Sequence, residues 1–178
     1  MPISLGVDRL LLISESKVCF YEKINYTFEL TKQLIFKFMN TKTLLAALVG
    51  GVVAFFLGWL VYGMVLESFM KENMNQCMMK AMEDMVWWAM IASNLFWGLS
   101  LALLLSWAGV TTFMGGLTKG AIFGLVLMLS FDLQFWSMSS MFNNMNAMVV
   151  DVLCGTIMNA LVAGVVGWML GRGNAAAA

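Results

Sequence analysis

Four long apolar stretches, separated by short polar segments, organise the sequence. They cover residues 43–66, 86–108, 117–138 and 147–170. A helix needs about 20 residues to cross roughly 30 Å of hydrocarbon, and each stretch reaches that length. None of them shows the alternation of apolar and polar residues that is typical of a membrane β-barrel. The pattern predicts an all-α fold: an integral membrane four-helix bundle.

The rest of the chain falls into segments of different character. The transmembrane domain is predicted to cover residues 39–171, followed by a flexible tail at 172–178. Residues 1–38 mix charged and apolar positions and contain no stretch long enough to span a membrane. We expect either a cytoplasmic or interfacial extension, with an amphipathic helix touching lipid, or a segment that is not native, because Met39 opens a short basic lead into the first span.

The distribution of lysine and arginine sets the expected orientation. Most of these residues precede the first span: Arg9, Lys17, Lys23, Lys32, Lys37 and Lys42. The second connection adds Lys119 and the tail adds Arg172, whereas the third connection carries no charge. Cytoplasmic segments are enriched in basic residues. Both termini of this multi-pass membrane protein are therefore predicted to be cytoplasmic.

Small or polar residues recur every fourth position in each span, which places them on one helical face. The lines are Ala46, Gly50, Ala54 and Gly58; Asn94, Gly98, Ala102 and Ser106; Gly116, Gly120 and Gly124, continuing to Met128, Asp132 and Trp136; and Asp151, Gly155, Asn159, Ala163, Gly167 and Gly171. Helices in lipid approach closely at small residues. Four such lines predict a tightly packed bundle.

Composition narrows the classes of function. Hydrophobic residues make up 61% of the 178 positions and charged residues 11%, against about 45–50% and about 25% in ordinary globular domains. That balance excludes a disordered chain and a nucleic-acid-binding protein. The sequence contains no histidine, and its three cysteines lie far apart. Catalysis by Ser-His or Cys-His pairs is excluded, and we expect a protein that is not an enzyme.

Polar residues inside the spans are the first candidate site. Asp132, Asp151, Asn94, Asn159 and Tyr62 are predicted to converge in the outer half of the bundle. A carboxylate at that depth costs about 2.5–3.5 kcal/mol on insertion scales, which a partner, a cation or a proton can offset. One interpretation is a proton- or cation-responsive site built on the two aspartates. The other is a hydrogen-bonded structural cluster, with Asp151 acting as a helix N-terminal carboxylate.

Methionine forms the second candidate site. Of the 18 methionines, many lie in the two connections expected to face the outside. The residues considered are Met70, Met74, Cys77, Met78, Met82, Met141 and Met145. Thioethers and thiolates suit Cu(I), so one hypothesis is an outward Cu(I)-binding surface, the one cofactor that the sequence suggests. The alternative is an amphipathic helix whose methionine face packs on the bundle.

The end of the first span carries a family resemblance. Gly58, Trp59, Tyr62 and Gly63, followed by Phe69-Met70, resemble the start of the small bacterial membrane proteins catalogued as domain of unknown function 1761. Leu60 and Val61 separate Trp59 from Tyr62, where that family has Trp-Tyr. The resemblance covers residues 40–171 through span spacing and a glycine-rich last helix. It implies a four-span fold in a bacterial inner membrane and no activity.

Three functions follow as hypotheses. The first is a non-enzymatic helix bundle that acts in the bilayer as a homo-oligomer or as a partner subunit. The second is passage or sensing of a small solute, proton or cation through Asp132 and Asp151. The third is Cu(I) binding by the outer methionines.

Overall fold

The computed structural model describes residues 28–29, 40–78, 80 and 82–172. The chain divides into Met1–Met39 and Asn40–Ala178. The predicted interfacial helix of residues 1–38 falls almost wholly outside the described residues. In the second unit, four helices are long and apolar enough to cross a membrane. This confirms the all-α four-span fold predicted from the apolar stretches.

The four spans are α2 with its extension, α4, α5 and α6. Helix α2 covers Thr41–Leu60 and continues as the π-helix η1 at Val61–Val65. Helix α4 covers Trp87–Trp107, α5 covers Phe113–Met138 and α6 covers Met145–Gly171. The connection between the first two spans holds α3, Glu67–Asn73, and two short 3-10 turns, Gln76–Met78 and Met82–Asp84.

Side-chain caps explain why three spans begin where they do. The side-chain oxygens of Asn40, Thr112 and Asn144 accept hydrogen bonds from the backbone three residues further on, at 2.8, 3.1 and 2.9 Å. Asn and Thr are favoured at this position because they satisfy amide groups that the helix leaves free. The third span thus begins four residues before the predicted residue 117, because Thr112 caps it.

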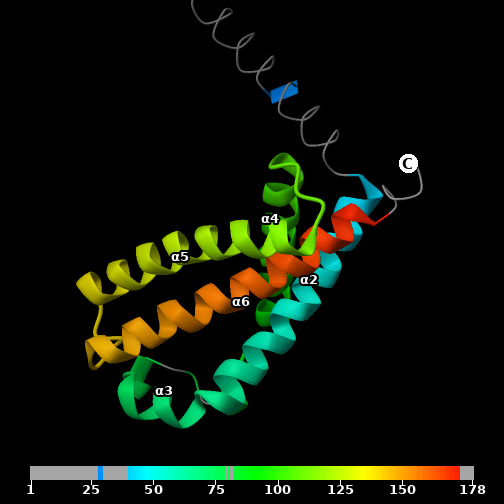
Figure 1. Ribbon diagram of the computed structural model, residues 1–178. Coiled ribbons are helices and arrows are strands. Elements are labelled where there is room, and N and C mark those ends of the chain that lie inside the picture. The colour runs from blue at the N-terminus through cyan, green and yellow to red at the C-terminus, as the bar shows by residue number, and fades with distance from the viewer. Residues whose placement is uncertain (1–27, 30–39, 79, 81, 173–178) are drawn as a thin grey trace, which may run out of the picture. The chain divides into compact units, whose positions relative to one another are not determined.

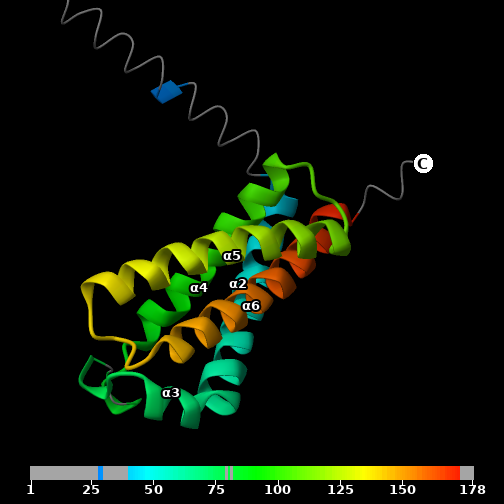
Figure 2. The same ribbon diagram turned by 60° about the vertical axis from the view of Figure 1, so that its left-hand side comes forward.

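Helix α6 is the centre of the bundle. It contacts α2, α4 and α5, whereas α5 packs almost exclusively on α6. Twelve residues of α6 are buried, against four of α5. Figures 1 and 2 show α5 and α6 running side by side in opposite directions, with α2 and α4 crossing behind them.

The two ends of the bundle differ. We call the end formed by residues 66–86 and the loop 139–144 the cap end, and the end formed by Asn40, the loop 108–112 and Arg172 the terminal end. At the cap end, α3 lies across the bundle (Figure 1). At the terminal end, α4 ends at Trp107 and the chain turns at Gly109, whose φ of 64° suits glycine. Large apolar side chains such as Phe56, Phe96 and Ile122 are exposed around the helices, as lipid contact requires.

The predicted small-residue faces are where the helices meet. A Cβ atom added to Gly98 of α4 would collide with the backbone of Gly51 and Ala47 in α2. One added to Gly116 or Gly120 of α5 would collide with the backbone of α6 at Ala163 or Asn159. These glycines therefore allow backbone-to-backbone contact, which is how helices associate in lipid.

Candidate functional site

The α5–α6 contact has one constant register along its length. Gly120 of α5 faces Ala163 of α6, Gly124 faces Asn159, and Met128 lies against Gly155. Each advance of four residues along α5 matches a retreat of four along α6. The next step in this series brings Asp132 of α5 to Asp151 of α6, and the two carboxyl groups are within hydrogen-bonding reach of each other. A pair of carboxyl groups thus takes the place of a small-residue contact.

Asp132 is the more buried member of the pair. Its side chain is 4% exposed, whereas Asp151 is half-buried. The Oδ2 atom of Asp132 is buried and has no hydrogen-bond partner within the described part of the chain. Most buried polar atoms in folded proteins have a partner, so this oxygen is a position where a proton, an ion or a water molecule would change the energy of the site.

Tyr62 joins the pair from the first span. Its hydroxyl group donates a hydrogen bond to Oδ1 of Asp151 at 2.6 Å. Tyr62 lies in the π-helical turn η1, where the amide of Leu66 donates to the carbonyl of Val61 at 2.7 Å. Single π-turns inside α-helices often occur at functional sites. Cys154 of α6 lies close enough to Tyr62 and Asp151 to interact electrostatically with both.

No ion pair within the described residues neutralises these carboxylates. Lys71 of α3 binds Glu67 at 2.6 Å and is exposed. Lys119 donates to the carbonyl of Ala108 at 3.0 Å, and Arg172 stacks on the Trp168 ring at 4.0 Å, both at the terminal end. The charge of the aspartate pair must therefore be balanced in another way.

The two asparagines named from the sequence lie outside this group. Asn94 donates from Nδ2 to the carbonyl of Met90 in its own helix, at 2.8 Å. Asn159 is buried, donates to the carbonyl of Gly155 and accepts a hydrogen bond from the Trp97 indole at 2.8 Å. Asn159 therefore ties α4 to α6 about two helical turns further toward the terminal end than Asp151. Trp97 is not among the site residues predicted from the sequence, although an indole N–H inside a helix bundle usually requires a partner.

The predicted amphipathic helix with a methionine face is interrupted, because α3 ends at Asn73. Met74 instead forms an isolated antiparallel bridge with Phe142. Met70 and Met74 are buried with Phe142, Ala147 and Met148 in a small apolar cluster, against which Met141 and Tyr62 pack. This cluster lies at the cap end of the bundle, next to Tyr62. The packing role of methionine thus applies to Met70 and Met74.

The remaining methionine-site residues do not join this cluster. Cys77, Met78 and Met145 are exposed, and the Met82 side chain lies outside the description. Among the described residues, no three His, Cys, Asp or Glu side chains form a group that could hold a metal ion. The Cu(I) hypothesis stays a prediction.

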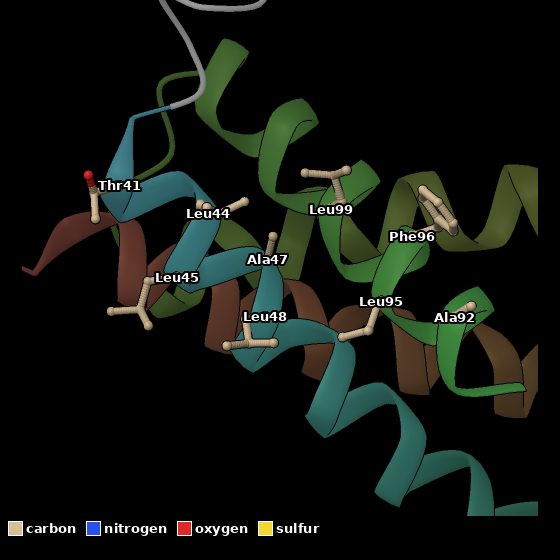
Figure 3. Close-up of a pocket in the computed structure, with 9 residues that line it drawn as sticks. All are labelled: Thr41, Leu44, Leu45, Ala47, Leu48, Ala92, Leu95, Phe96 and Leu99. Carbon is tan, nitrogen blue, oxygen red and sulfur yellow. The ribbon is translucent and has the colours of Figure 1, made fainter. Parts of the chain in front are cut away.

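An apolar groove of about 560 Å³ lies on the outside of the bundle between α2 and α4. Leu44, Leu45 and Leu48 line it from α2, and Leu95, Phe96 and Leu99 line it from α4 (Figure 3). Its lining includes no charged residue and one hydroxyl, that of Thr41. In a membrane this groove faces acyl chains, and its lining offers no polar group that would select a ligand.

Comparison with protein-family models, with curated proteins and with solved structures returns no match. The resemblance to the domain of unknown function 1761 family therefore stays a prediction, and the candidate function rests on the geometry of the site.

Proposed function

We propose that this protein is a non-enzymatic membrane bundle that binds a proton or a small cation at the Asp132–Asp151 pair. The observation that carries the proposal is the combination of two facing carboxyl groups, one almost fully buried, with an unpartnered oxygen on Asp132. Two negative charges within hydrogen-bonding reach of each other repel strongly in a low-dielectric interior. A bound proton or cation removes that repulsion.

Binding at the pair is coupled to the packing of α5 on α6. At the terminal-end half of this interface, glycine backbone contacts hold the helices whatever the charge state. At the cap-end half, the carboxyl pair occupies the contact, so loss of the bound proton or cation would separate the helices there. Because α5 has little other support, its cap-end half is the part of the bundle that would move.

The structure of the interface favours sensing over passage by a single chain. The contact from Gly116 to Gly124 is so close that a Cβ atom has no space. A solute that reached Asp132 would find this contact blocking further movement between α5 and α6. This geometry supports binding of a ligand that enters from one side of the bundle and does not pass through it.

Ligand-linked stability tests the proposal. The purified protein is reconstituted in nanodiscs, and its unfolding temperature is measured over a pH series and with increasing NaCl at constant ionic strength. A ligand that binds only the folded protein adds about 1.4 kcal/mol for each tenfold rise in its concentration once the site is saturated. We expect stability to fall as the pH rises or to increase with Na⁺.

Two variants make this result specific. Asp132→Asn replaces the carboxyl group by a neutral group of the same shape and should abolish the response. Glu72→Gln removes an exposed carboxylate of α3 and should keep the wild-type response. A full response in Asp132→Asn, or no response in the wild type, would overturn the proposed function.

A further inference from the structure

We propose that the ligand is a single proton, held on Asp132 and shared with Asp151, and that Tyr62 determines which carboxyl group holds it. This inference rests on the proposed function and replaces its broader ligand class by one species. It assigns Asp132 as the acid, Asp151 as the charged acceptor and Tyr62 as a positioning residue.

The direction of the hydrogen bonds carries the assignment. An ionised carboxylate only accepts hydrogen bonds, so contact between two carboxyl groups requires a proton on one of them. The Tyr62 hydroxyl already donates to Oδ1 of Asp151 at 2.6 Å. If Asp132 holds the shared proton, two donors converge on Asp151, which is the arrangement that stabilises a carboxylate. The proton therefore belongs on Asp132.

The burial of the two groups leads to the same assignment. Asp132 is 4% exposed and Asp151 is half-buried, and burying a charge costs far more than burying a neutral polar group. The unpartnered Oδ2 of Asp132 is then the carbonyl oxygen of a neutral acid. Leaving a carbonyl oxygen without a hydrogen-bond partner costs less free energy than leaving a charged carboxylate oxygen without one.

The donor set is too small for a hard metal cation. Ca²⁺ takes about 6–8 oxygen ligands and Mg²⁺ requires a near-octahedral set. Here the two carboxyl groups are joined by a tyrosine whose hydroxyl hydrogen is committed to Asp151. No third acidic, cysteine or histidine side chain completes a metal-binding group in the described residues.

The side chains described around the Asp132–Asp151 pair include no basic group that would neutralise it, so a proton is its main source of positive charge. From the first span the titratable neighbour is Tyr62, and from α6 it is Cys154. Helix α4 contains no Asp, Glu, Lys or Arg. In the cap, Glu67 and Lys71 pair with each other in solvent. In α5 the nearest basic residue is Lys119, roughly 20 Å away at 1.5 Å per residue.

Infrared difference spectroscopy of the full chain in nanodiscs, recorded between acidic and alkaline pH, tests the inference. We expect one buried carboxylic-acid C=O band that is lost at high pH and shifts when aspartate is labelled with ¹³C. The label identifies the band without a mutation, so the test does not depend on whether a variant folds. Asp132→Asn should remove the band, and Asp151→Asn should shift it but keep it.

Tyr62→Phe supplies the readout for the positioning role. It removes only the hydroxyl group, so a merely structural tyrosine would leave the band and its pH midpoint unchanged. We expect the band to shift in frequency and the midpoint to move.

Three results would overturn the inference. The first is a band that persists in Asp132→Asn and vanishes in Asp151→Asn, which would place the proton on Asp151. The second is a band that Na⁺ removes at constant pH and ionic strength, which would make a cation the ligand and leave the proposed function standing. The third is the absence of any such band together with stability that neither pH nor Na⁺ alters, which would overturn both proposals.

Discussion

The two halves of the α5–α6 interface have the same register but different chemistry. In the terminal-end half, Gly116, Gly120 and Gly124 lie against the backbone and small side chains of α6. In the cap-end half, Met128 lies on Gly155 and Asp132 meets Asp151. The first half is held by packing, which neither pH nor salt alters appreciably. The second depends on how two carboxyl groups are neutralised, so one helix pair combines a fixed contact with a responsive one.

A bulky residue in the glycine half should have the largest effect on stability. In Gly116→Val, the new side chain would overlap the carbonyl group of Ala163, and because that group is helical backbone, α5 and α6 must move apart to accommodate it. We expect a loss of about 3 kcal/mol in the free energy of unfolding, at the upper end for overpacked cores, measured by denaturant titration in mixed micelles.

Gly58→Ala is the matched control for that substitution. A Cβ atom at Gly58 would meet only the end of Met158, at 3.8 Å, an ordinary contact distance. The variant should be as stable as the wild type or more stable, because alanine favours the helix over glycine. If both glycine variants lose the same stability, close packing is not what holds the terminal-end half.

Loss of the polar link between α4 and α6 should have an intermediate effect. Asn159→Leu removes the acceptor of the Trp97 indole and places a larger side chain against Gly124. We expect a loss of about 1–3 kcal/mol, the penalty for an unsatisfied buried donor. A double-mutant cycle with Trp97→Phe should return a coupling of about 0.6 kcal/mol, typical of hydrogen bonds in membranes. A coupling of zero would contradict the bond.

Among the substitutions that remove a contact, Tyr62→Phe should change stability least. It removes one hydrogen bond to Asp151, so we expect about 0.6 kcal/mol in the free energy of unfolding. Its main effect should be on the proton of the carboxyl pair. A loss of several kcal/mol without any change in pH response would instead make Tyr62 a structural residue of the cap end.

Much of this arrangement follows from the sequence. The two lines of small residues in the third and fourth spans, joined by a short loop, run antiparallel, and their fourfold spacing brings Asp132 to Asp151. Tyr62 closes the corresponding line of the first span and reaches the same level. Helical periodicity and span length depend on residues that are close together in the sequence, so both can be predicted without a structure.

Other features depend on contacts that periodicity does not encode. Asn94 follows the same spacing as Gly98, yet its amide bonds to its own helix, because the local carbonyl of Met90 is as good an acceptor as a distant group. The π-turn at Tyr62 and the bridge between Met74 and Phe142 arise from how the cap folds back. Helical periodicity alone does not distinguish them from a continuous helix with a methionine face.

Paired spin labels measure directly whether α5 separates from α6 at the cap end only. With the native cysteines replaced, one pair of labels is placed on the exposed cap-end positions Ser137 and Val149 and another on the exposed positions Thr118 and Leu161. Pulsed electron resonance then gives both distance distributions as a function of pH. We predict that the cap-end distribution lengthens or broadens when the shared proton is removed, that the Thr118–Leu161 distribution stays fixed, and that Asp132→Asn abolishes the change. Equal movement of both pairs, or no movement of either across a pH range that titrates the carboxyl pair, would contradict a separation of α5 from α6 confined to the cap end.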